Sequence, residues 1–157
     1  VTGVQTCALP ISASLHHHHK DCDELFATAE EAADSRSGDW PRLFQRLRAE
    51  LEAHFITEEE LLFPAFEAAT GMTAGPAQVM RMEHAQMREL LKQMADAVGT
   101  ENAARYGAIG ETLLVLMQQH NMKEEHILYP MCDRSLGDAG LDVAGGLQQR
   151  RAAPWPA

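Results

Sequence analysis

The sequence predicts an all-α protein, an antiparallel up-down-up-down four-helix bundle built from two duplicated helix hairpins. Three observations predict this fold class. Four long amphipathic segments are separated by turn-forming residues, no segment alternates with the period of a strand, and β-branched residues are sparse. Long helices joined by short loops pack antiparallel to their neighbours, which gives a bundle.

Turn signals set the expected limits of each helix. The first helix ends before a polar stretch, and the second follows Asp39 as a helix cap and Pro41 in its first turn. The third opens at Pro76, and the fourth follows Thr100 as its N-cap. The expected helices cover residues 16–33, 41–69, 76–98 and 101–135. Pro64 and Pro130 fall inside two of these helices and are expected to bend them.

Composition narrows the possible functions. The 157 residues carry a formal net charge of −10, so binding to nucleic acid is disfavoured. The longest strongly apolar stretch, residues 113–117, is too short to cross a bilayer, so no membrane span is expected. Cys22 and Cys132 are isolated and form no C-x-x-C pattern, which favours a reducing, cytoplasmic location. Eight histidines and eight methionines in so short a chain indicate metal chemistry.

The chain divides into three parts. Residues 1–11 match the translation of a common sequencing adapter letter for letter, and are interpreted as a non-native segment. Residues 12–137 form the predicted bundle. Residues 138–157 are expected to be a C-terminal tail without recognisable chemistry, partly disordered.

An internal duplication carries the chemistry. HFITEEELLFP at 54–64 and HNMKEEHILYP at 120–130 share the pattern H-x-x-x-E-E-x-x-L-[FY]-P and lie 66 residues apart. A lone histidine precedes each copy, His19 by 35 residues and His84 by 36, and both are followed by Glu-Leu at the same offset. The sequence therefore contains two copies of one helix hairpin.

The spacing places the histidine and the first glutamate of each motif on one helix face. Residues i and i+4 lie about 40° apart around a helix, whereas residues i and i+5 lie about 140° apart. Glu59, Glu125 and His126 are therefore expected to point away from the site. If each of the four helices turns this face toward the interior, four histidines and two glutamates meet at one level of the bundle. These residues are His19, His54, Glu58, His84, His120 and Glu124.

Two buried carboxylates need cations between them. Each metal ion would take two imidazoles, and both carboxylates could bridge the pair, a donor set that suits iron, with manganese or zinc as substitutes. Without metal, Glu58 or Glu124 is expected to take up a proton to relieve their repulsion. A ferritin-like di-iron bundle would need E-x-x-H motifs, and the chain contains none.

These residues resemble the hemerythrin-like, or HHE cation-binding, family over about 15–135. The resemblance rests on HKDCDELF, HFITEEELLFP, GPAQVMRMEHAQMRELL and HNMKEEHILYP. It implies a four-helix bundle with two iron ions in an oxo- or hydroxo-bridged centre. The implied ligands are His19, His54, Glu58, His84, His120 and Glu124, with the two glutamates bridging.

The resemblance implies binding or sensing of O2 or a related diatomic such as NO, and a metal-binding protein rather than a dedicated enzyme. In oxygen carriers the third helix supplies a second histidine, where this chain has Arg88, and the fourth carries H-x-x-x-x-D. The ligand set is closer to bacterial di-iron proteins of nitrosative stress. Detoxification of NO or peroxide, repair of iron centres, and iron storage or a structural metal bundle therefore remain alternatives, and the protein partner stays open.

Other candidates near the site are assigned to packing or to solvent. His16 lies close to His19 on the same helix, but the Glu-Leu offset selects His19 as the ligand. His17 and His18 are expected to face solvent, and Cys22 to be a small buried filler. Tyr106 lies 14 residues before His120, too far along the helix to be a ligand.

Overall fold

The computed structural model describes residues 10–151, and all regular structure in this part of the chain is helical. The prediction of an all-α chain is confirmed for these residues. The elements are α1 (Ile11–Asp34), α2 (Trp40–Thr57), the π-helix η1 (Glu58–Leu62), α3 (Phe63–Thr70), α4 (Pro76–Gly99), α5 (Ala103–Lys123), the π-helix η2 (Glu124–Leu128), α6 (Tyr129–Leu136) and α7 (Ala139–Arg150).

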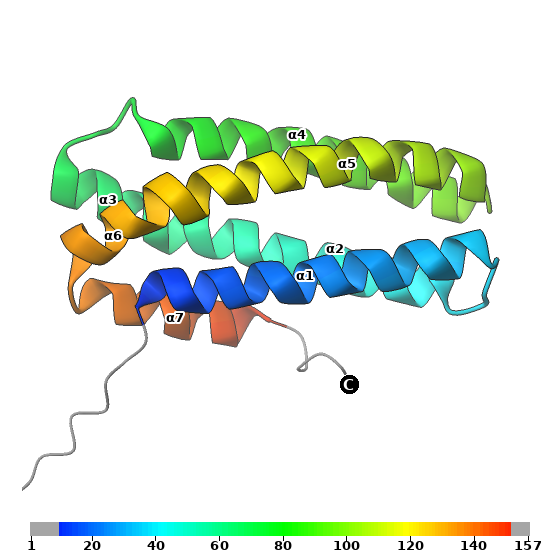
Figure 1. The fold of residues 1–157 in the computed structure, drawn as a ribbon, viewed down its shortest axis with the longest axis horizontal. Coiled ribbons are helices and arrows are strands. Elements are labelled where there is room, and N and C mark those ends of the chain that lie inside the picture. Colours follow the sequence, from blue (N-terminus) through cyan, green and yellow to red (C-terminus); the bar gives the residue numbers. More distant parts are fainter. Residues whose placement is uncertain (1–9, 152–157) are drawn as a thin grey trace, which may run out of the picture.

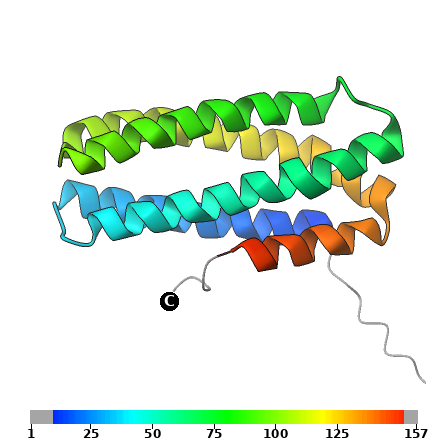
Figure 2. The same ribbon diagram turned by 180° about the vertical axis from the view of Figure 1, so that it is seen from behind.

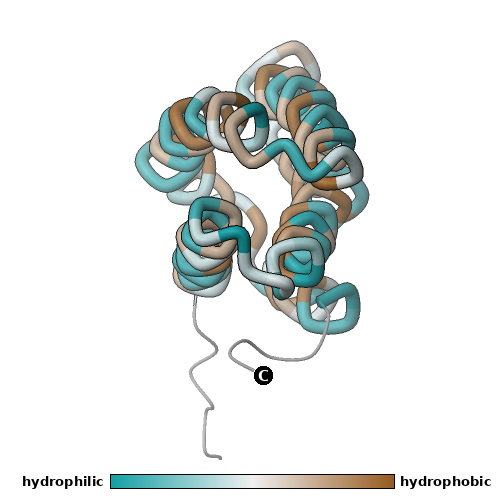
Figure 3. Tube along the Cα trace, turned by 90° about the vertical axis from the view of Figure 1, so that its right-hand side faces the viewer, coloured by the Kyte–Doolittle hydropathy of each residue, from teal (hydrophilic) through white to brown (hydrophobic). Residues whose placement is uncertain are grey.

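Four long helical runs lie side by side. α2, η1 and α3 form one continuous run, and α5, η2 and α6 form another, while α1 and α4 are single helices. Figures 1 and 2 show that consecutive runs are connected at alternate ends of the molecule. Seen end-on, the runs surround a common axis (Figure 3), and α1 contacts both α2 and α5 while α4 contacts α5 and α2. Side chains from all four runs can therefore meet on that axis.

Helix boundaries differ from the expected ones by a few residues. α1 begins at Ile11 rather than residue 16, and Ile11 itself is buried. The cap of α5 is Asn102, whose side chain accepts a hydrogen bond from the Arg105 N–H, and not Thr100. The Thr100 hydroxyl instead donates to the Asp96 carbonyl at the end of α4. Residues 1–9, which make up most of the segment interpreted as non-native, lie outside the described residues.

Each proline within a long run follows a π-helical segment. η1 precedes Pro64 and η2 precedes Pro130, so the two duplicated motifs widen at the same place. In both, the first residue after the segment donates its N–H to the carbonyl five residues earlier, Phe63 to Glu58 and Tyr129 to Glu124. A π turn therefore holds one residue more than an α turn, and such turns occur frequently at functional sites.

A layer of buried polar side chains separates two hydrophobic clusters. One cluster includes Phe26, Phe44 and Leu113, and the other includes Leu15, Phe66 and Leu147. The buried polar side chains are His18, His19, Glu50, His54, Thr57, Glu58, Glu83, His84, His120 and Glu124. Burial of so many ionisable groups is costly unless each is paired or bound to a metal, which marks this layer as a site.

The segment assigned to the C-terminal tail contains a helix. α7 packs against α1, α2 and η1, and runs beside them in Figure 1. Val143 and Leu147 are buried by this contact. Gly146 faces Leu61 so closely that a β-carbon would lie 2.3 Å from its Cδ1 atom, so a larger residue would require the Leu61 side chain to shift.

Candidate metal centre

The structure brings all six predicted ligands together in the polar layer. Each of the four long runs contributes at least one of them, and each of the six residues is at most 4% exposed. Their donor atoms fall into two groups, which share Glu124. The first group contains His19, His54 and Glu124, and the second contains Glu58, His84, His120 and Glu124.

The first group of donors lies between α1 and α2. The Nε2 atoms of His19 and His54 are 3.1 Å apart. His19 Nε2 lies 3.1 Å from Oε2 of Glu124, and His54 Nε2 lies 3.2 Å from Oε1 of Glu58. Each of these two imidazole nitrogens therefore faces a carboxylate oxygen, His19 that of Glu124 and His54 that of Glu58.

The second group lies between α4 and α5. His84 Nε2 is 3.1 Å from Oε2 of Glu58, and His120 Nε2 is 2.9 Å from Oε1 of Glu124. These four atoms are buried and have no hydrogen-bond partner. Glu58 and Glu124 thus each direct one oxygen to the first group and the other oxygen to the second.

The unpartnered atoms test whether a metal fits this site. Four buried donor atoms without hydrogen bonds would be costly in a protein that bound nothing there, because each has lost its water. Imidazole and carboxylate donors with no thiolate suit iron, zinc or manganese. The residues present therefore fit a pair of metal ions.

Three glutamates hold the histidine rings from outside. Oε1 of Glu125 lies 2.8 Å from His19 Nδ1, and Oε1 of Glu59 lies 2.9 Å from His84 Nδ1. Oε2 of Glu83 lies 2.8 Å from His120 Nδ1. A carboxylate accepting from Nδ1–H leaves Nε2 free to bind metal and fixes the ring orientation.

Glu59 and Glu125 lie outside both donor groups, as expected, but the expectation that they face elsewhere is wrong, because each contacts a histidine of the site. The angle of about 140° separates each glutamate from the histidine of its own helix. Each glutamate instead contacts a histidine of the other hairpin, to which that angle does not apply. Glu59 of η1 reaches His84 of α4, and Glu125 of η2 reaches His19 of α1.

The fourth ring, His54, is held through a second histidine. His54 Nδ1 lies 3.0 Å from His18 Nδ1, and His18 Nε2 lies 2.8 Å from Oε2 of Glu50. Burial lowers the pKa of His18 to about 4, although the hydrogen bond to Glu50 acts in the opposite direction. A neutral His18 that donates to Glu50 must accept at Nδ1, so His54 donates its Nδ1–H and keeps Nε2 for the metal.

His18 is completely buried, so the expectation that it faces solvent is wrong. His17 is exposed as expected. His16 lies outside both donor groups, with its Nδ1 atom 2.7 Å from Oε1 of Glu125. Cys22 is a buried filler, with its sulfur 3.9 Å from His18 Nε2, and Tyr106 packs against Trp40 at a distance from the site.

Tyr129, which the sequence did not single out as a site residue, is fully buried beside the first donor group. Its hydroxyl oxygen lies 2.5 Å from Oε1 of Glu58 and 2.7 Å from Oε2 of Glu124. The tyrosine in the L-[FY]-P part of the second motif was the only sequence feature that could have pointed to it. On an α-helix Tyr129 would lie about 140° from Glu124, five residues earlier, but η2 brings the two residues to the same side.

The charges in the metal-free layer are opposite to those expected. Burial and the charge of Glu124 raise the pKa of Glu58, but the neighbouring histidines outweigh both effects and its pKa is lowered. The pKa of Glu124 is likewise held well below its usual value, chiefly by His120. Burial lowers the pKa of His54, but the charges of Glu58 and Glu124 raise it to about 10. Protons therefore sit on imidazoles rather than on the two carboxylates.

Comparison with known proteins assigns this site to a family. The family model described as the hemerythrin HHE cation binding domain matches residues 11–132, which include all six candidate ligands. The chain belongs to this family. Its donor set, four imidazoles and two carboxylates that each face both histidine pairs, is consistent with two iron ions.

Several curated relatives of the HHE domain share one name, iron-sulfur cluster repair protein YtfE. The protein from Edwardsiella ictaluri is 31% identical over 150 residues, which cover 85% of this chain and 66% of that protein. Those from Musicola paradisiaca and Escherichia coli O81 are 37% and 34% identical over 92 and 94 residues. The chain thus spans between 40% and 66% of the length of these relatives. No solved structure gives a significant match.

Arg88 occupies the position where oxygen carriers of the HHE family have a further histidine. Its guanidinium lies against Glu59, with Nη1 2.7 Å from Oε1, and its Nη2 also lies 2.8 Å from Oε1 of Glu52. Hydrogen bonds from His84 and Arg88 lower the pKa of Glu59 to about 2 despite its partial burial. Arg88 therefore keeps charged the glutamate that orients His84.

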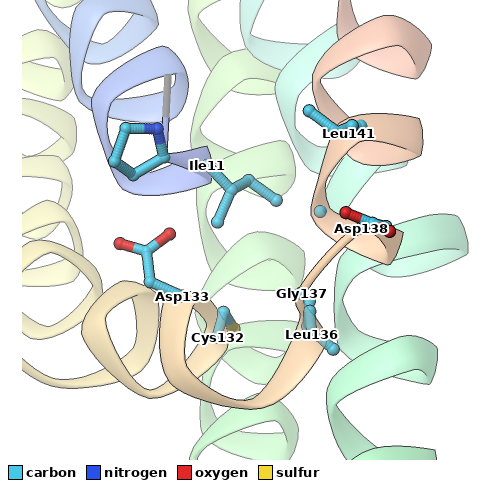
Figure 4. A pocket seen from close by; sticks show the side chains of 9 residues that line it. Ile11, Cys132, Asp133, Leu136, Gly137, Asp138 and Leu141 are labelled. Atoms are coloured by element: carbon cyan, nitrogen blue, oxygen red, sulfur yellow. The ribbon is translucent and has the colours of Figure 1, made fainter. Parts of the chain in front are cut away.

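Two surface pockets differ in their position relative to the HHE site. One of about 400 Å³ lies between α1 and α5, and His19 and Glu125 form part of its lining. Another of about 370 Å³ lies where Ile11, Cys132 and Leu141 meet at the end of the molecule (Figure 4), and none of the six candidate ligands lines it. Among residues 10–151, no helix is long and apolar enough to cross a membrane.

Proposed function

We propose that the chain binds two iron ions, one at His19 and His54 and one at His84 and His120. Glu58 and Glu124 would bridge the two ions. The strongest support is that the two oxygens of each glutamate face different histidine pairs. One oxygen of Glu58 faces His54 and the other faces His84. Glu124 divides in the same way between His19 and His120.

We also propose that residues 12–137 form an up-down-up-down antiparallel four-helix bundle made of two duplicated hairpins, and that residues 1–11 are a non-native segment. The placement of η1 and η2 at equal positions in the two copies supports a duplication. The ring stacking is also repeated, since the ring centres of Phe63 and His84 are 5.7 Å apart and those of Tyr129 and His19 are also 5.7 Å apart.

The proposed function of the iron pair is to bind or sense O2 or a related diatomic such as NO. Iron in this donor set supplies open coordination positions and a change of oxidation state. The protein supplies a buried layer between two apolar clusters, which excludes bulk water. The outer glutamates fix the imidazoles, and the pocket that His19 helps to line adjoins the polar layer from outside.

Repair of iron-sulfur clusters under nitrosative stress is the second candidate, supported by the name of the relatives, iron-sulfur cluster repair protein YtfE. In both candidates the working location would be the cytoplasm. The free and buried Cys22 and Cys132 are consistent with that reducing compartment.

Iron content and ligand binding test the proposal together. Iron-loaded protein should contain two iron ions per chain, and the reduced form should change its absorption spectrum on titration with O2 and with NO. His84→Ala should lower the iron content, whereas His17→Ala, a matched change at an exposed histidine, should not. Chelator-treated protein should stay helical but melt at a lower temperature.

Fewer than two iron ions per chain in the wild type would contradict the two-ion site. Two bound ions without a spectral response to O2 or NO would instead favour iron storage or a structural metal. Transfer of iron to a cluster-free acceptor protein, without stable binding of the diatomic, would favour repair.

A further inference from the structure

The hydroxyl group of Tyr129 lies among the donor atoms of the first group and next to one oxygen of Glu58. Its oxygen is 3.2 Å from His19 Nε2 and 3.3 Å from His54 Nε2. It is 2.5 Å from Glu58 Oε1 and 2.7 Å from Glu124 Oε2. One oxygen atom is therefore close to every atom that would bind the metal at His19 and His54.

These distances resemble the spacing between neighbouring ligands of one ion. Donor atoms about 2.1 Å from an octahedral metal are separated by about 3 Å when they are adjacent. The four donors approach this spacing along the series Glu58, His54, His19 and Glu124, where the steps are 3.2, 3.1 and 3.1 Å. The ends of one diagonal, His54 and Glu124, are 3.9 Å apart. The tyrosine oxygen lies 2.5 to 3.3 Å from all four atoms, close to the spacing between adjacent donors of one ion.

The other half of the molecule has no counterpart of this hydroxyl. Phe63 lies 66 residues before Tyr129 in the duplicated motif. Each ring stacks on the lone histidine beside it, Phe63 on His84 and Tyr129 on His19, both with 5.7 Å between ring centres and 26° between ring planes. The donor atoms near Phe63 are the ones that have no hydrogen-bond partner.

We propose that Tyr129 is a fifth protein ligand of the iron held by His19 and His54, so that the two iron positions are chemically different. This inference rests on the proposed two-iron site. When the phenol oxygen binds Fe(III), the O–H bond breaks, an O–Fe bond forms and one proton is released to solvent, with no transfer of electrons. The iron at His84 and His120 keeps four protein donors and is the more open position for a diatomic ligand.

A phenolate bound to Fe(III) gives a visible charge-transfer band and tyrosinate ring vibrations in the resonance Raman spectrum. The assignment is direct because the chain contains only one other tyrosine, Tyr106, which is buried in the hydrophobic cluster with Phe44. We expect the band in the iron-loaded wild type and in Tyr106→Phe. We expect it to disappear in Tyr129→Phe, with iron still bound.

A swap of the two aromatic residues provides the matched variant. Phe63→Tyr combined with Tyr129→Phe moves the phenol to the other position, and the band should return with changed ring frequencies. Iron content separates the possible failures. Wild-type protein without iron would overturn the two-iron site itself. Wild-type protein with two Fe(III) ions and no tyrosinate vibrations would overturn the ligand role of Tyr129 alone, as would a band that persists in Tyr129→Phe.

Discussion

Glu125 and His19 lie 106 residues apart and meet at 2.8 Å, between Oε1 of the carboxylate and Nδ1 of the ring. The matching contact in the other direction joins Glu59 to His84 at 2.9 Å. The second glutamate of each duplicated motif thus orients a histidine of the opposite hairpin. Neither hairpin alone contains a fully supported set of ligands.

Removal of either glutamate should weaken metal binding. A histidine that loses the carboxylate on its far nitrogen loses both its orientation and part of its basicity, which costs roughly 10- to 100-fold in affinity. We expect this loss for Glu125→Ala and for Glu59→Ala in competition with a metal-binding dye. Glu111→Ala, at an exposed position on α5, serves as the control. Equal affinities in all three variants would contradict the orienting role.

His18→Leu should lower the free energy of unfolding. The substitution leaves Nδ1 of His54 without its buried partner and leaves Oε2 of Glu50 with Arg151 alone, which costs about 1–3 kcal/mol. Urea denaturation of metal-free protein measures this change, with His17→Leu as the exposed control.

The effect of His18 should also depend on pH. Because burial lowers its pKa from 6.5 to about 4, its contribution is complete above pH 6.5 and is lost as the pH falls toward 4. The difference between wild type and His18→Leu should therefore shrink across that interval. A difference that grows toward acid would show that the buried ring is charged.

Metal binding at pH 7 should release protons. The pKa of His54 is raised to about 10 by Glu58 and Glu124 despite its burial, so the metal-free ring is charged, whereas a ligating ring must be neutral. Calorimetry in buffers of different ionisation enthalpy should show at least one proton released per chain. Binding heats that are independent of the buffer would contradict this.

The same raised pKa affects the stability of the metal-free protein. Stabilisation by charged His54 is fully present below pH 6.5 and is lost as the pH rises through about 10. Chelator-treated protein should therefore lose melting temperature between pH 7 and pH 10. Metal-loaded protein should change less over this interval, because its imidazoles are already neutral.

Arg151→Gln should destabilise the packing of the C-terminal segment. The guanidinium donates from Nε to Oε2 of Glu50 at 3.0 Å and from Nη2 to Asp21 at 2.8 Å. Glu50 is fully buried and retains His18 and Arg46 as partners, so we expect a loss of about 1–3 kcal/mol. Arg134→Gln, at an exposed position, is the control in the same thermal melts. Identical melting of both variants would show that the Arg151 contacts do not stabilise the fold.

The cysteines of the described region should resist alkylation. Burial raises the pKa of the Cys132 thiol to about 12 and raises that of Cys22 as well. Since the thiolate is the reactive form, iodoacetamide at pH 8 should modify neither residue in folded protein and both in urea. Peptide mapping by mass spectrometry distinguishes them from Cys7. Rapid modification of Cys22 in folded protein would contradict its burial.

The duplicated motif was sufficient to predict which six side chains meet. Histidine at i and glutamate at i+4 share a face whether the helix is α throughout or widens afterwards, and the structure brings His54 and His120 close to Glu58 and Glu124, respectively. Element limits were less predictable, since Asn102 and Thr100 are both good caps and only the structure shows which one accepts a backbone N–H.

The residues around the ligands were missed for two physical reasons. Glu59, Glu125 and His18 act across helices, and an angle around one helix carries no information about a neighbour. Tyr129 was missed because a constant 100° per residue does not hold through η2. The first copy of the motif has Phe63 at the same position, and a phenylalanine there suggests only packing.

The π segments make the length of the motif as important as its residues. If η2 kept all its residues but became a regular α-helix, everything after it would turn by about 100°. Tyr129 would leave the site, and Leu128 and Cys132 would leave the apolar cluster that they now share with Leu15. A single-residue insertion inside H-x-x-x-E-E-x-x-L-[FY]-P would likewise turn the residues after it by about 100°, so insertions should be selected against more strongly than most substitutions. The number of residues between the first glutamate and the proline therefore fixes where the following side chains point. It is one residue larger than an α-helix would need.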